Sequence, residues 1–132
     1  MQNGKIAVPT NNPGGLEAER SDHFGHCDTY TVVDIVDGVI ERTETVNNSG
    51  HEEGGCMVPV QKLGELGVDA ILVGGIGTRP LQGFAEHGIE VFFAPKVLFP
   101  DAGSAVDGLL LNKLPIMEPG QACKGHGKCH SH

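Results

Sequence analysis

Short apolar runs alternate with polar, glycine-rich stretches along the first third of the chain. Lys5 to Pro9 is an apolar run that predicts a buried first strand, and the turn-forming residues after it predict a loop. Thr29 to Val36 and Val39 to Val46 are rich in Val, Thr and Ile. The Asp37-Gly38 dipeptide between them fits a two-residue type I′ turn, so these segments predict an antiparallel hairpin.

Apolar residues then recur at helical spacing, between further short apolar runs. The pattern predicts helices at Met57 to Leu66, Pro80 to His87 and Asp101 to Asn112, and strands at Val68 to Val73 and Ile89 to Phe93. Gly67 and Gly88 follow the first two helices, where glycine commonly ends a helix. We expect the two strand-helix-strand units to form parallel neighbours joined by right-handed crossovers. With the hairpin, this predicts a mixed five-stranded α/β sheet.

The apolar periodicity stops at Pro115. A chain of 132 residues is long enough for one domain with a hydrophobic core and too short for two comfortable ones. We therefore expect one domain over residues 1–114, followed by a linker and a flexible Cys/His-rich tail over residues 115–132.

The charge balance narrows the classes of partner. Nine Lys and Arg against 17 Asp and Glu give a formal charge of −8, and no basic stripe is visible, so nucleic acid is not an expected partner. No apolar run approaches the length of a membrane span, and the first residues lead into a strand instead of a signal peptide, so we expect a cytoplasmic protein. In that compartment the four cysteines are better explained as ligands or thiols than as two disulfides.

The tail has the densest group of candidate metal ligands. Cys123, His126 and Cys129 are spaced three apart, and His130 and His132 follow them. Thiolates and neutral imidazoles bind borderline and soft metals, and a segment this short and glycine-rich would owe any order to the metal. The alternative is a disordered tail that collects stray divalent ions, and ligand density favours true metal binding.

Two loops carry further Cys and His residues. His23, His26 and Cys27 lie between the first strand and the hairpin, and His51 and Cys56 lie in the glycine-rich loop after it. Cys56 precedes a predicted helix, whose N–H groups and dipole lower the pKa of a thiol. The alternatives are solvated histidines in the first loop and, with equal weight, a small buried thiol at position 56.

A glycine-rich loop leaves a predicted strand and enters a helix. Because open α/β folds bind ligands at the carboxyl ends of their parallel strands, and because main-chain amides there suit an anion, this loop is a candidate cofactor-binding element. The glycine spacing required for a dinucleotide is absent. A tight turn that simply needs glycine is an equally good explanation. The candidate residues are Gly74, Gly75, Gly77, Thr78 and Arg79.

Taken in order, several motifs resemble the dinitrogenase iron-molybdenum cofactor biosynthesis family, the NifX and NifB C-terminal-like proteins. The resemblance covers about Lys5 to Leu114 and implies a ribonuclease H-like three-layer α/β fold. The motifs are Lys5 to Thr10, His23-Phe24-Gly25, Asp37-Gly38, His51 to Cys56 and Gly74-Gly75-Ile76-Gly77.

The resemblance implies a small carrier of metal-sulfur clusters, including nitrogenase cofactor precursors and, in one branch, a mixed molybdenum-copper sulfide. It does not imply nuclease activity, because two-metal hydrolysis needs clustered carboxylates and the first strand has none at residues 7–9.

Three functions follow from these observations. The first is a noncatalytic carrier that holds an anionic metal-sulfur cluster at the three core loops, receives it from a donor protein and passes it to a recipient. Arg79 and the glycine-loop amides would compensate the cluster charge, and the tail would help to capture or cover the cluster.

The second is a divalent metal binder or sensor that holds Zn, Ni or Cu mainly through the tail. The third is a small enzyme using Cys27 with His23 or His26. It is disfavoured because adjacency in sequence is not an orienting triad and no oxyanion hole is identified.

Overall fold

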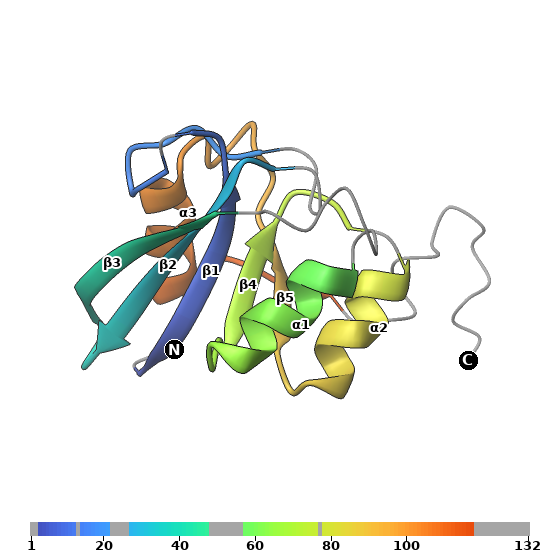
Figure 1. Cartoon of the computed structure of the whole chain (residues 1–132). Helices are drawn as coiled ribbons and strands as arrows, with labels where there is room; N and C mark the ends of the chain where they lie inside the picture. The colour runs from blue at the N-terminus through green and yellow to red at the C-terminus, as the bar shows by residue number, and fades with distance from the viewer. Residues whose placement is uncertain (1–2, 13, 22–26, 48–56, 77, 118–132) are drawn as a thin grey trace.

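The computed structural model describes residues 3–12, 14–21, 27–47, 57–76 and 78–117 (Figure 1). Three helices and six strands occur in this part of the chain. In chain order they are β1 (Gly4–Thr10), β2 (Thr29–Val36), β3 (Val39–Asn47), α1 (Met57–Glu65), β4 (Ala70–Val73), α2 (Thr78–Glu86), β5 (Glu90–Phe93), α3 (Ala102–Leu110) and β6 (Ile116–Met117).

The strands form one mixed sheet in the order β3-β2-β1-β4-β5-β6. β1 is parallel to β4 and β4 is parallel to β5, while the β1–β2, β2–β3 and β5–β6 pairs are antiparallel. The mixed α/β class is therefore confirmed.

Two details of the predicted sheet are wrong. The sheet has six strands instead of five, because Ile116–Met117 pairs with β5 in the stretch that the sequence assigned to a linker. A strand of two residues is too short to show a period of its own. The strands on either side of α1, β3 and β4, are also not neighbours, since β2 and β1 lie between them.

The β2–β3 hairpin is confirmed with its predicted turn. Asp37 and Gly38 have φ angles of 54° and 77°, as a type I′ turn requires. The register then shifts between Asp34 and Ile35, which leaves an extra residue on β3. Because of this bulge, Ile40 and Val46 pack against the two opposite faces of the sheet.

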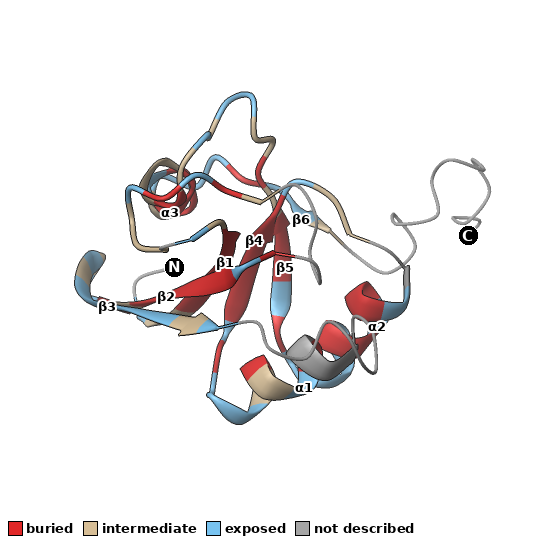
Figure 2. Ribbon diagram, turned by 45° about the horizontal axis from the view of Figure 1, so that its top comes forward, coloured by how far each residue is buried: buried red, intermediate tan, exposed pale blue. Residues whose placement is uncertain are grey.

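Helices cover both faces of the sheet (Figure 1). α1 and α2 bury Val60, Leu63, Leu81 and Phe84 against one face, and α3 buries Ala105, Val106 and Leu109 against the other. The central strands are accordingly buried on both sides, while β3 is largely exposed at its edge (Figure 2).

The three helices end in the same way. Gly67 and Gly88 have φ angles of 80° and 74°, which confirms their predicted role after α1 and α2. Asn112, with a φ of 60°, takes this place after α3. In each case the next residue donates its N–H to a carbonyl in the last turn, at 2.8 to 3.2 Å. Within the described residues, no helix is long and apolar enough to cross a membrane.

Candidate functional site

The loops that carry the predicted ligands leave the same edge of the sheet. β1, β4 and β5 are parallel, and β3 runs in the same direction because two antiparallel pairs connect it to β1. Their last residues are Thr10, Asn47, Val73 and Phe93. We call the end of the sheet marked by these four residues the carboxyl edge; it is where open α/β folds bind ligands.

A small part of the predicted site lies within the described residues. Gly74 and Arg79 are exposed and Gly75 is partly exposed, all just beyond β4. Thr78 is the first residue of α2. The remaining predicted site residues lie outside the described residues: His23, His26, His51, Cys56, Gly77, Cys123, His126, Cys129, His130 and His132.

Cys27 is the predicted metal ligand that the structure does describe. Its side chain is 2% exposed and belongs to the apolar cluster between the sheet and the helices α1 and α2. Burial among apolar groups disfavours the thiolate form that binds metals. Within the described ranges, no group of three or more His, Cys, Asp and Glu side chains could hold a metal ion.

The segment between β1 and β2 is fastened on both sides. The N–H of Ser21 donates to the carbonyl of Pro9 at 3.0 Å, and the N–H of Arg20 donates to the carbonyl of Pro100 at 3.1 Å. The N–H of Asn12 donates to Oδ2 of Asp28 at 3.1 Å. These bonds fix Ser21 and Asp28, which flank the first predicted ligand loop, to the carboxyl edge.

Buried threonines connect β1 and β2 at this edge. Oγ1 of Thr10 lies 2.6 Å from Oγ1 of Thr29 and 3.0 Å from Oγ1 of Thr31, and all three side chains are at most 1% exposed. Thr31 also accepts the N–H of Gly15 at 2.9 Å. Because buried hydroxyls need partners, this network holds the loop after β1 against the sheet.

Arg20 also lies at this edge, although its sequence context did not mark it as a candidate site residue. Its side chain is 1% exposed, and Nη1 donates to the carbonyl of Phe99 at 2.8 Å. Nη2 lies 3.8 Å from the position that a β-carbon would take at Gly74. A single arginine in a polar stretch of sequence is normally exposed, so the sequence pattern does not indicate its burial.

Lys96 and Glu19 add an ion pair nearby, with Nζ 3.1 Å from Oε2. The hydrogen bond from Lys96, followed by its charge and by a hydrogen bond from Asn11, lowers the pKa of the Glu19 carboxyl below its ordinary value. The Glu19 side chain is 64% exposed, so solvent screens much of this attraction.

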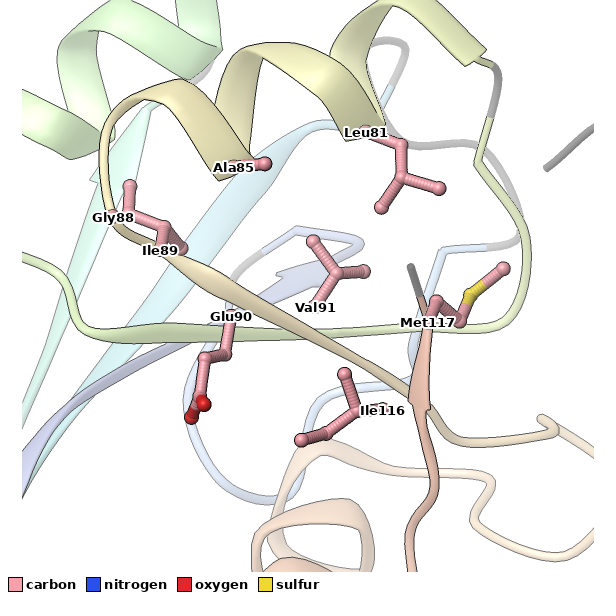
Figure 3. A pocket seen from close by; sticks show the side chains of 8 residues that line it. All are labelled: Leu81, Ala85, Gly88, Ile89, Glu90, Val91, Ile116 and Met117. Atoms are coloured by element: carbon pink, nitrogen blue, oxygen red, sulfur yellow. The ribbon is translucent and has the colours of Figure 1, made fainter. Parts of the chain in front are cut away.

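A separate cavity of about 260 Å³ lies between α2 and the β5–β6 edge (Figure 3). None of the predicted ligand residues lines it, and Glu90 is the charged member of an otherwise apolar lining. This cavity is therefore unsuited to a metal or an anion. The lining residues are Leu81, Ala85, Gly88, Ile89, Glu90, Val91, Ile116 and Met117.

Solved structures share this architecture. The orange protein from Desulfovibrio gigas, in its apo form, matches with a TM-score of 0.74 and 25% identity, over 89% of this chain and 93% of that chain. A Methanocaldococcus jannaschii protein matches with a TM-score of 0.69 and 19% identity, over 89% of this chain and 97% of that chain. At that lower identity the likeness shows the fold alone.

Sequence comparisons go further than the fold. An uncharacterised protein of Methanocaldococcus jannaschii is 32% identical over 92 residues, which span 68% of this chain and 74% of that protein. A family model described as dinitrogenase iron-molybdenum cofactor matches residues 4–107. The match confirms the resemblance seen in the sequence motifs. The chain belongs to the dinitrogenase iron-molybdenum cofactor family.

Proposed function

We propose that this protein is a noncatalytic carrier that binds a metal-sulfur cluster related to the iron-molybdenum cofactor at the carboxyl edge. The family assignment supports an association with that cofactor. The similar orange protein was described in an apo form, which is consistent with a protein that binds and releases a group. A cytoplasmic location and the ribonuclease H-like classification of the fold are parts of this proposal.

One observation supports the proposal: the described residues next to the ligand-rich loops and several basic side chains lie at one edge of the sheet. The first loop is fastened there through Ser21 and Asp28, and the second begins after Asn47 at the end of β3. Arg20, Lys96 and Arg79 lie at the same edge, on the β1–β2 segment, after β5 and at the start of α2. Thiometallate clusters are anionic, so local cations are needed in a protein of charge −8.

The proposed cluster ligands are His23, His26, Cys27, His51 and Cys56. Imidazole and thiolate suit iron, copper and molybdenum sulfides, and the main chain at Gly74 and Gly75 would face the cluster oxygen or sulfur atoms. Cys27 is buried in the core, so it would bind from the inner wall of the site.

A second candidate function is divalent metal binding by the tail. Cys123, His126, Cys129 and His130 lie beyond the residues that the family model matches, so this function is independent of the carrier domain. The spacing and chemistry of these ligands favour Zn, Ni or Cu. In the carrier proposal the same tail would assist capture of the cluster.

Anaerobic purification without added metal, followed by elemental analysis and a visible spectrum, tests both functions. The carrier proposal predicts molybdenum or iron with acid-labile sulfide and charge-transfer bands. A colourless protein holding only zinc would overturn it and support the tail function. Deleting residues 123–132 separates the two sites, because a cluster bound at the carboxyl edge is retained and tail-bound zinc is lost.

A further inference from the structure

β3 is the outermost strand on one side of the sheet, and among the described residues no other strand pairs with its outer side (Figure 2). It is nine residues long, and residues 41–45 are all exposed. The strand at the opposite side of the sheet, β6, has only two residues. An outer strand offers unpaired N–H and C=O groups, so a long exposed one is a site for the addition of another strand.

The bulge determines which face of the sheet each side chain of β3 occupies. Glu44 pairs with Val32 and Val46 pairs with Tyr30, and both of these β2 residues belong to the apolar cluster beneath α1 and α2. Glu41 is the extra residue of the bulge and has no partner in β2. Because side chains alternate on either side of it, the α1–α2 face carries Val39, Arg42, Glu44 and Val46, and the α3 face carries Ile40, Thr43 and Thr45.

The charges of β3 are complementary to those of a second copy of the same strand. When two copies run antiparallel about a two-fold axis at Thr43, Arg42 of each copy lies opposite Glu44 of the other, on the same face. Opposite charges in directly opposed positions stabilise a strand pair, and like charges destabilise it. A two-fold axis at Arg42 or at Glu44 would instead place two like charges opposite each other. The charges therefore favour one symmetric register over its neighbours.

The apolar residues of β3 fit the same register. If Glu41 bulges out in each copy, as it does opposite β2, Val46 lies opposite Val39 of the other copy and Thr45 lies opposite Ile40. Val39 is 63% exposed, which is unusual for a large apolar side chain, and this pairing would cover it. Pairs of β-branched residues are among those that stabilise neighbouring strands. Charge and apolar pattern thus agree on the occupant of this edge.

We propose that β3 is the interface of a symmetric dimer in which two copies of this chain pair edge to edge and form one continuous sheet. This inference goes beyond the proposed carrier function and does not depend on it. Because the two β3 strands are antiparallel, the two carboxyl edges point toward opposite ends of the joined sheet. The formal charge of −8 on each copy opposes association, so we expect a weak dimer that forms in the micromolar range of concentration.

The test is sedimentation equilibrium of the full chain over a range of concentrations, with a reductant and a chelator so that neither disulfides nor metals link the copies. Arg42→Glu and Glu44→Arg each place like charges opposite each other at two positions, so each is expected to weaken the dimer at least about tenfold. The double variant exchanges the two charges within one chain and is expected to dimerise like the wild type. A mixture of the two single variants is expected to form heterodimers, because every Arg then meets a Glu.

Glu41→Arg is the matched control. It changes the net charge by the same amount as Glu44→Arg and lies in the same strand, but it alters a residue that has no partner in the pairing. It is expected to leave the dissociation constant within about threefold of the wild-type value. All three positions are exposed, so the variants are expected to fold, which circular dichroism checks.

Loss of the dimer in both single variants, with recovery in the double variant and in the mixture, supports the proposal. A wild-type chain that stays monomeric up to about 1 mM refutes it. A dimer that both single variants retain also refutes it, because the copies then associate through another surface. If the double variant stays as weak as the single ones, the register at Thr43 is wrong and the proposal fails. None of these outcomes alters the carrier function, which the bound metal and sulfide measure.

Discussion

Gly64 of α1 is in contact with His87, the residue directly after α2: a β-carbon at position 64 would lie 2.8 Å from Cδ2 of the imidazole. The ring is held over α1 by Nδ1, which lies 2.9 Å from the carbonyl oxygen of Gly83. Glycine within a helix normally costs stability, so its presence here is explained by the close approach of the two helices that cover one face of the sheet.

This contact predicts a coupling between positions 64 and 87. Gly64→Ala should gain about 0.5–1 kcal/mol of unfolding free energy from helix propensity in a His87→Ala background, and little or nothing in the wild type. A double-mutant cycle measured by urea unfolding would show the difference as a coupling of about 1 kcal/mol. Equal effects of Gly64→Ala in both backgrounds would show that the imidazole moves away without cost.

A second prediction concerns Gly14, in the loop after β1. Gly14 has a φ of +81°, and a β-carbon there would lie 2.6 Å from Cγ2 of Thr45 and 3.1 Å from Oγ1 of Thr29. Gly14→Ala should therefore lower the unfolding free energy by about 2–4 kcal/mol through strain and overpacking. Gly15→Ala is the control, because its φ of +102° is also positive but nothing lies within 4 Å. Equal losses in both variants would contradict the predicted clash.

The pKa of Glu19 gives a prediction about acid stability. Lys96 lowers this pKa in the folded state, so the ion pair stabilises the fold above the ordinary carboxyl pKa and loses that effect as the pH falls through the lowered value. Lys96→Gln should raise the Glu19 pKa toward its ordinary value, which NMR titration would measure. It should also flatten the dependence of stability on pH below about pH 4.5. An unchanged Glu19 titration would mean that Lys96 does not pair with it in solution.

Burial of Cys27 predicts that its thiol reacts slowly in the native state. In a chain whose other three cysteines are replaced by serine, Cys27 should react with a disulfide reagent roughly 100-fold more slowly in the native state than in urea, because a 2% exposed side chain reacts through opening of the fold. Rapid native labelling would show that the core opens at this point without unfolding, and would strengthen Cys27 as a cluster ligand. Retention of far-UV circular dichroism by the triple variant is the control.

Local signals explain what the sequence predicted correctly. The Asp37-Gly38 turn and the glycines after α1 and α2 depend on the φ of one or two residues, so a dipeptide or a single glycine specifies them. Strand order is different in kind. β1 pairs with both β2 and β4, and this pairing is determined by long-range packing instead of by local sequence periodicity. The prediction that β3 lies beside β4 was wrong for this reason.

The candidate site also has one part that local sequence signals predict and one part that depends on long-range packing. The carboxyl edge and the Gly74 turn follow from the order of strands and helices, since a strand that enters a helix ends where open α/β folds bind ligands. Burial of Arg20 depends on contacts with Phe99 and Pro100, about 80 positions away in the chain. Sequence patterns report local periodicity, so a cation brought to the site by such distant contacts stays hidden until the fold is known.

β6 predicts where the folded domain ends. Met117 packs against the apolar cluster beneath α1 and α2, and the N–H of Phe93 donates to the carbonyl of Pro115 at 2.9 Å. A chain that ends at Leu114, the boundary expected from the sequence, loses both interactions and leaves the edge of β5 uncovered. We expect it to be less stable than a chain that ends at Met117 by about 2 kcal/mol, from lost apolar burial and hydrogen bonds. Urea unfolding of the two truncated chains against the full chain measures the difference. If the two truncated chains are equally stable, the β5–β6 pair contributes nothing and the fold is complete at residue 114. If the chain ending at Met117 is as stable as the full chain and the chain ending at Leu114 is not, the boundary lies after β6.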